Sequence, residues 1–131
     1  MDRTDRSASS RDSALALRRV ERHQRIVEVM AGADRPWAAS DLAAQLGVSQ
    51  RTIERDLERL RLSGVPIDAR RGRGGGAFLA ARPGIRRFEM SVTEVAALLA
   101  SMVALGPSAT DAARSATAAL VDALLSRDGD R

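Results

Sequence analysis

The segment from Ser49 to Arg59 carries several hydrogen-bond donors at the spacing of a helix. Arg51 and Arg55 are four residues apart and share one helical face, while Ile53 and Leu57 lie nearly opposite them. Guanidinium groups bind phosphate oxygens and guanine edges in bidentate geometry. The chemistry that this pattern favours is recognition of a polyanion by the outer face of a helix whose inner face is buried.

A solvated amphipathic helix with ordinary surface arginines has the same pattern, so the neighbouring residues must decide. Before it, residues 40–47 predict a short helix capped by Ser40, and Gly47 suits a helix stop. Val48 is expected to fill the space between the two helices, and Ser49 to cap the second one. The stretch from residue 40 to 63 therefore predicts two helices joined by a tight turn.

A hairpin is predicted directly after these helices. Two short apolar segments, 64–69 and 77–80, flank the glycine-rich stretch RRGRGGG, which carries Arg70, Arg71 and Arg73. A flexible linker is the alternative, because a glycine-rich stretch alone is a weak signal. Following the helix pair at once, the stretch favours a basic wing able to reach a phosphate backbone or a narrow minor groove.

Residues 22–80 resemble the DNA-binding domain of DeoR-like and WYL-domain transcriptional regulators. The matching pieces are RHQRIVEVM, SDLAAQLGVSQRTIERDLERL and GVPIDARRGRGGGAFL. Two departures affect the expected DNA sequence preference and not the fold. Gln50 and Glu54 stand where such proteins often have basic or aromatic residues, and Ala77-Phe78 replaces the usual Tyr-Arg pair.

The expected ligand is double-stranded DNA, with the second helix in the major groove and the wing on the backbone or minor groove. Gln50, Arg51 and Arg55 are expected to contact base edges. The flank of the helix and the wing are expected to contact phosphate. The predicted DNA-binding residues are Ser49, Gln50, Arg51, Thr52, Arg55, Arg59, Arg70, Arg71 and Arg73.

The charge distribution agrees with this expectation better than the net charge of +4 does. Residues 1–90 contain 18 Arg against 12 acidic residues, whereas residues 91–131 contain 3 Arg against 5 acidic residues. The basic part of the chain is thus the part predicted to meet phosphate. Lys is absent, which coding bias explains as readily as function does.

Composition argues against other classes of function. Without cysteine, the chain has no thiolate metal site, and the lone His23 is expected at the surface or boundary of the first helix. No set of nucleophile, base and oxyanion donors is apparent, so no enzyme, cofactor or metal site is predicted. No apolar stretch suits a membrane span or signal peptide, and a cytoplasmic protein is expected.

The expected domain order begins with a disordered leader, residues 1–13, and a winged helix-turn-helix domain, residues 14–82. Ser13 is predicted to cap a first helix from Ala14 to about Ala31, with Leu15, Val20, Ile26, Val27 and Met30 facing the core. Trp37 is expected to be a packing anchor in the following loop. A linker, residues 83–90, follows Arg82-Pro83-Gly84.

Residues 91–126 predict a helical hairpin rich in Ala and Leu, and residues 127–131 are expected to fray. A capping box, Ser91 to Glu94, opens its first helix, and residues 108–111 open its second. The hairpin either completes the core of the monomer or holds two copies together, and a homodimer through residues 91–126 is favoured. The resemblance places the linker helix of the regulators here, but no WYL effector domain is expected.

The predicted fold class is mainly α with a small β-hairpin, a winged helix-turn-helix followed by a C-terminal helical hairpin. The predicted function is sequence-specific DNA binding by a transcriptional regulator. The alternative is a truncated regulator, or a winged-helix protein-interaction module, that modulates a full-length relative. The basic residues at the predicted wing tip favour DNA as the ligand.

Overall fold

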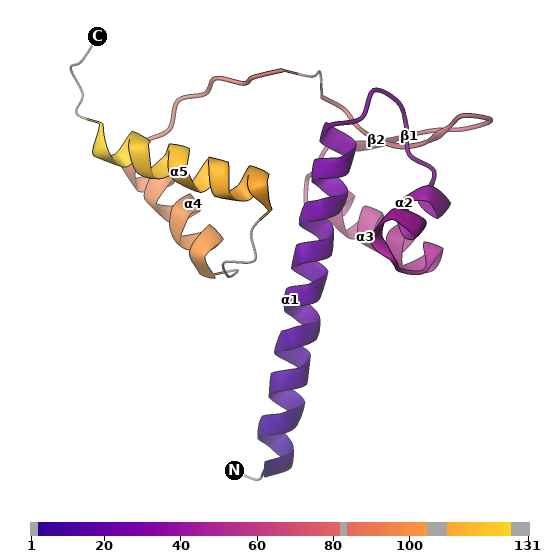
Figure 1. The fold of residues 1–131 in the computed structure, drawn as a ribbon, viewed down its shortest axis with the longest axis horizontal. Helices are drawn as coiled ribbons and strands as arrows, with labels where there is room; N and C mark the ends of the chain where they lie inside the picture. The colour runs from indigo at the N-terminus through magenta and orange to yellow at the C-terminus, as the bar shows by residue number, and fades with distance from the viewer. Residues whose placement is uncertain (1–2, 82–83, 105–109, 127–131) are drawn as a thin grey trace. The chain divides into compact units, whose positions relative to one another are not determined.

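A computed structural model of the chain describes residues 3–81, 84–104 and 110–126. It divides into two units, Met1–Gly84 and Ile85–Arg131, which are considered separately here. The first unit contains helices α1 to α3 and the strands β1 and β2, and the second contains α4 and α5 (Figure 1). The mainly helical fold with one antiparallel hairpin confirms the predicted fold class and is consistent with a winged helix-turn-helix.

Helix α1 spans Arg3–Ala31, so the prediction that it begins at Ala14 was wrong. Residues 3–13, expected to form a disordered leader, are helical, and the Ser13 hydroxyl donates to the Ser9 carbonyl instead of capping a helix start. The segment lacks Gly and Pro, and Asp5 lies in the first turn, where the helix dipole favours a negative charge. The absence of helix-breaking residues thus permits the extension, although the many Ser, Thr and Asp residues of the segment favour a helix only weakly.

Only the C-terminal part of α1 enters the core of the first unit. Ile26 and Met30 are buried one helical turn apart, and Val27 packs beside them. Leu15, predicted to face the core, is 58% exposed, because no other element of the unit covers the N-terminal half of the helix. Val20 is half-buried, at the point where the exposed part of α1 meets the part that enters the core.

Helix α2 spans Ala39–Leu46 and buries Leu42 and Ala43. Its N-cap is Ala38 and not the predicted Ser40, because the extended backbone at Trp37 ends there and the Ala38 carbonyl accepts from the amide of Leu42. Gly47 ends the helix as predicted, in the left-handed conformation with φ of 68°.

Helix α3 spans Gln50–Leu62 and packs against α2. The Ser49 side chain accepts a hydrogen bond from the Thr52 amide, so the predicted N-cap is confirmed. Ile53, Leu57 and Leu60 are buried on one face, as their spacing predicted. Val48 packs against the same core from the turn between the helices.

Strands β1, Ile67–Arg70, and β2, Gly76–Leu79, form the predicted antiparallel hairpin. Trp37 extends this sheet, because its amide and carbonyl exchange two 2.8 Å hydrogen bonds with Ala77. Gly76 is needed at this contact: a Cβ atom there would lie 2.1 Å from the Trp37 carbonyl oxygen. Trp37 is partly buried against the core, which agrees with the predicted packing role.

The second unit consists of α4, Val92–Ala104, packed against α5, Asp111–Leu125. Ser91 and Glu94 form the predicted capping box, with hydrogen bonds of 2.7 and 3.2 Å, and Thr110 caps α5. Hydrogen bonding to Ser91 lowers the pKa of the Glu94 carboxyl. The bond from the Ser91 backbone has the larger effect and the bond with the Ser91 side chain the smaller. Residues 108 and 109, predicted to help open the second helix, and residues 127–131, predicted to fray, lie outside the described residues.

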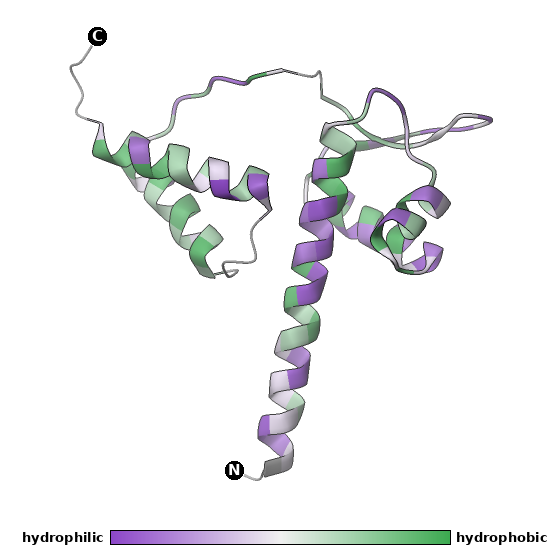
Figure 2. Cartoon of the chain, in the orientation of Figure 1, coloured by the Kyte–Doolittle hydropathy of each residue, from purple (hydrophilic) through white to green (hydrophobic). Residues whose placement is uncertain are grey.

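Val95 is the sole buried side chain among the described residues of this second unit. Large apolar side chains are exposed on both helices, including Leu98, Val103 and Leu125. Figure 2 shows that hydrophobic residues make up much of both α4 and α5. No helix in the described part of the chain is both long enough and apolar enough to cross a membrane.

Candidate nucleic-acid interface

The outward face of α3 presents two arginines that are ready to bind a ligand. Arg51 and Arg55 are exposed, and no hydrogen bond or ion pair within the described residues engages either guanidinium group. They lie opposite the face that buries Ile53 and Leu57. This arrangement leaves ten N–H donors free on a helix held firmly from behind, about five on each guanidinium group.

Three other predicted residues at the start of α3 already take part in hydrogen bonds. The Gln50 side-chain amide donates to Glu54 Oε1 over 3.1 Å. The hydroxyl oxygens of Ser49 and Thr52 lie 2.9 Å apart. These contacts hold the side chains in place at the start of the helix, and DNA would have to share or replace them.

Glu54 places a negative charge between the predicted base-contacting residues, since it follows Gln50 by one helical turn. A carboxylate repels phosphate but accepts a hydrogen bond from the amino group of cytosine. Its presence restricts which bases this face can contact.

Arg59 lies on the flank of α3 and is 48% exposed in its side chain. Its Nη1 atom is 3.9 Å from Oδ1 of Asp56, which is too long for a hydrogen bond but close enough for electrostatic attraction. The guanidinium group therefore remains available to a phosphate while the carboxylate limits its motion.

The wing carries the remaining predicted residues. Arg71 and Arg73 are exposed in the turn between β1 and β2, and Arg70 ends β1 with its guanidinium carbon 5.7 Å from the centre of the Phe78 ring. This separation suits a cation–π interaction. Phe78, noted in the sequence as a departure from the family pattern, thus orients the Arg70 side chain.

The structure also contains a charged cluster that the sequence reasoning missed. Asp56 is fully buried on α3 and binds two residues of α1. Arg22 donates through Nε to Oδ2 and through Nη2 to Oδ1, the second over 3.2 Å, and His23 Nε2 lies 2.9 Å from Oδ1. Because a carboxylate only accepts, His23 carries a proton on Nε2.

This cluster keeps the carboxylate ionised. Burial alone would raise the pKa of Asp56, but the hydrogen bonds from Arg22 and His23 outweigh it, so the pKa lies below its ordinary value. The hydrogen bond to Asp56 raises the pKa of Arg22 in turn. One sequence signal pointed to this arrangement: Asp56 directly precedes Leu57, next to the apolar face of α3, where an unpaired charge would be costly.

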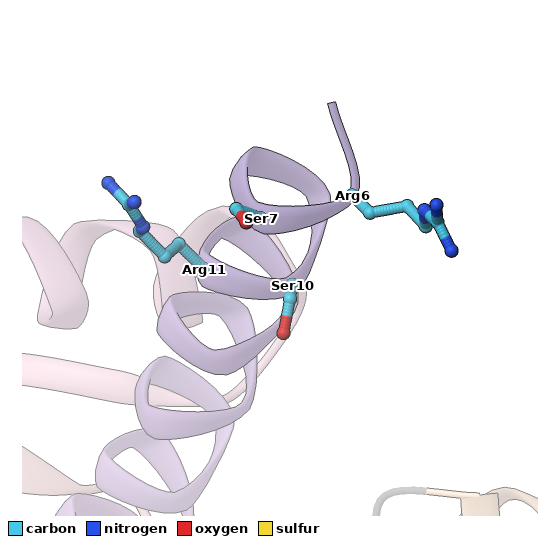
Figure 3. A pocket seen from close by; sticks show the side chains of 4 residues that line it. All are labelled: Arg6, Ser7, Ser10 and Arg11. Atoms are coloured by element: carbon cyan, nitrogen blue, oxygen red, sulfur yellow. The ribbon is translucent and has the colours of Figure 1, made fainter. Parts of the chain in front are cut away.

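A shallow hollow on α1, lined by Arg6, Ser7, Ser10 and Arg11, does not form a binding site. The side chains of Arg6 and Arg11 point to opposite sides of the helix (Figure 3). Within the described residues, no group of side chains is arranged to hold a metal ion.

Comparison with known proteins agrees with this geometry. Residues 22–76 match a family described as "HTH domain", and the match includes the C-terminal part of α1, helices α2 and α3, and β1. No solved structure matches the chain significantly. The match supports a helix-turn-helix family, a class of DNA-binding domains, whereas the narrower resemblance to DeoR-like and WYL-domain regulators remains an expectation.

Proposed function

We propose that the protein is a sequence-specific DNA-binding transcriptional regulator, with α3 in the major groove and the wing on the backbone or minor groove. The observation that carries the proposal is the pair of unengaged guanidinium groups, Arg51 and Arg55, on the outward face of a helix-turn-helix second helix. Arginine in this position suits the O6 and N7 acceptors of guanine. The resemblance to DeoR-like and WYL-domain regulators supports the same function.

The proposed contacts divide into two groups. Gln50, Arg51 and Arg55 read base edges, since they lie on the outer face near the start of α3. The phosphate contacts come from the flank of α3 and from the wing; these residues are Ser49, Thr52, Arg59, Arg70, Arg71 and Arg73. Phosphate contacts set the register of the protein on the duplex, whereas base contacts set its sequence preference.

We also propose that two copies associate through residues 91–126. Helices of 13 and 15 residues are too short to be stable alone, and this pair buries just Val95 among its described residues. Leu98 is 42% exposed and Val103 is 69% exposed, so the pair has apolar surface left to cover. A four-helix arrangement of two hairpins would cover it.

Dimerisation also fits the needs of operator recognition. One recognition helix reads a few base pairs, and two copies would place their α3 helices about 34 Å apart on successive major grooves. Each large apolar side chain buried in the interface would contribute about 1.5–3 kcal/mol before the cost of association is subtracted.

A second candidate function rests on the same exposed apolar helices. The α4–α5 hairpin could pair with the corresponding hairpin of a longer relative, and the chain would then modulate that relative as a truncated partner. Sedimentation equilibrium separates the two cases, because a homodimeric regulator is a dimer by itself at micromolar concentration.

Selection of binding sites from random duplex DNA tests the main proposal. The full chain should enrich one sequence, and a two-fold symmetric one if it binds as a dimer. Arg51→Ala should alter the preference at one base pair of each half-site. Uniform recovery of all sequences by the full chain would contradict sequence-specific function.

A further inference from the structure

Asp56 is the one fully buried charged side chain among the described residues, and it lies on the proposed recognition helix. Its carboxylate oxygens accept from Arg22 and His23, both on α1, while Arg59 approaches from α3 itself. In the described part of the chain, no buried side-chain nitrogen or oxygen lacks a hydrogen-bond partner. The cluster is therefore a fully satisfied polar contact inside an otherwise apolar interface.

Stability alone is a weak explanation for such a group. Buried ion pairs often contribute no more than apolar residues of the same size, because desolvation offsets the attraction. What distinguishes buried ion pairs from apolar contacts is that their hydrogen bonds are directional. A bidentate arginine and a histidine fix the position of a carboxylate in three dimensions. The apolar contacts of Ile53 and Leu57 are non-directional by comparison.

The rotation of α3 about its own axis decides where its DNA-facing side chains point. Arg55 directly precedes Asp56, and Arg59 follows it by three residues. At a side-chain radius of about 5–6 Å, a rotation of roughly 20° moves a side-chain tip by about 2 Å. A binding side chain can be displaced by only about 0.5 Å before its contact is weakened, so a small loss of rotational constraint on α3 would reduce base recognition.

We propose that Asp56 is a positioning residue: through Arg22 and His23 it fixes the orientation of α3 against α1 and so sets the sequence discrimination of the DNA interface. The inference rests on the proposed function for its DNA consequence. Its structural part, the orientation of α3, is measurable without DNA.

The structural part is tested by the distance between two spin labels. The chain contains no cysteine, so Arg19→Cys on α1 and Leu62→Cys at the end of α3 give two specific labelling sites, both exposed. A large excess of unlabelled protein removes distances between copies. In the labelled full chain, Asp56→Asn should shift or broaden the distance distribution by about 2 Å or more.

The DNA part is tested by the ratio of dissociation constants for non-specific and selected duplexes. This ratio is measured at a temperature at which circular dichroism shows that each variant is fully folded. Asp56→Asn should reduce this ratio at least about tenfold, the scale of one good base contact. Met30→Ala, which removes a buried α1 side chain away from the cluster, should lower the melting temperature and leave the ratio unchanged.

A second pair of variants covers the case in which Asp56→Asn does not fold. His23→Gln keeps a side-chain N–H donor for Asp56 and should retain the ratio, whereas His23→Leu removes the donor and should reduce it. The inference is overturned if the label distances, or the ratio of dissociation constants, keep their wild-type values in every folded variant among Asp56→Asn and His23→Leu. If the wild-type chain selects no sequence, the proposed function fails, and the label distances still decide whether Asp56 positions α3.

Discussion

Replacing Arg70, Arg71 and Arg73 together with Ala is expected to flatten the salt dependence of DNA binding. Arg71 and Arg73 are exposed in the turn of the wing, and Arg70 lies over the Phe78 ring. No described acidic group forms an ion pair with any of the three. Their full charge is therefore available to neutralise phosphates and release counterions.

The magnitude follows from the number of charges. Each neutralised phosphate contributes about 0.9 to the slope of log affinity against log salt, so three give a change of up to about 2.7. Raising the salt fourfold, from about 50 to 200 mM, should therefore weaken the variant roughly 40-fold less than it weakens the wild type. If Arg70 stays on Phe78 and contacts no phosphate, the change falls to about 1.8.

The assay is fluorescence anisotropy with one labelled duplex at five or more salt concentrations. A matched control removes the same charge elsewhere, through Arg6→Ala, Arg11→Ala and Arg19→Ala on the exposed half of α1. Screening beyond about 10 Å at 0.1 M salt should leave the slope of this control near that of the wild type. An unchanged slope in the wing variant would exclude the wing from the interface.

Four further predictions concern other parts of the chain. Arg51→Ala should cost about 1–3 kcal/mol of discrimination at one base pair, and unaltered affinity and preference would refute its role. Sedimentation equilibrium should give a dimer for the full chain and a monomer for a chain ending at Arg87; a monomeric full chain at tens of micromolar would refute the dimer. Because the pKa of Asp56 is lowered by folding, the folded state binds fewer protons than the unfolded chain, so its contribution is full above about pH 4 and is lost as the pH falls through the folded-state pKa. Denaturant unfolding between about pH 2 and 7 should thus show a steeper acid loss for the wild type than for Asp56→Asn, and parallel curves would contradict this. Gly76→Ala should destabilise the fold by at least about 1–3 kcal/mol, since its φ is 144° and a Cβ would meet the Trp37 carbonyl; a melting temperature within a degree of the wild type would contradict that geometry.

The features that sequence predicted correctly depend on local interactions. The capping box of Ser91 and Glu94, the Ser49 cap and the Gly47 stop each involve residues within one helical turn. The buried face of α3 follows from the period of its apolar residues. Such features do not require knowledge of what lies across the core.

Two of the features that the sequence did not predict depend on contacts between residues that are distant in the chain. A third lies in a segment that makes no such contacts. Ser40 has the right chemistry for a cap, but the Trp37–Ala77 pairing ends at Ala38 and sets the helix start there. Asp56 lies more than 30 residues from Arg22 and His23, so no local pattern joins them. The early part of α1 is exposed and buries no apolar face, so the sequence there has no apolar period to detect.

The pairing of Trp37 with Ala77 determines how much of the wing must become ordered when it meets DNA. A hairpin of two strands is marginally stable in water by itself, and fixing one residue of backbone costs about 1–2 kcal/mol of conformational entropy. Here the base of the hairpin is already held by a third chain segment that the folding of the domain supplies. Association with a duplex then has to immobilise only the few residues of the turn around Arg71 and Arg73, so more of the electrostatic attraction of the wing is retained as affinity.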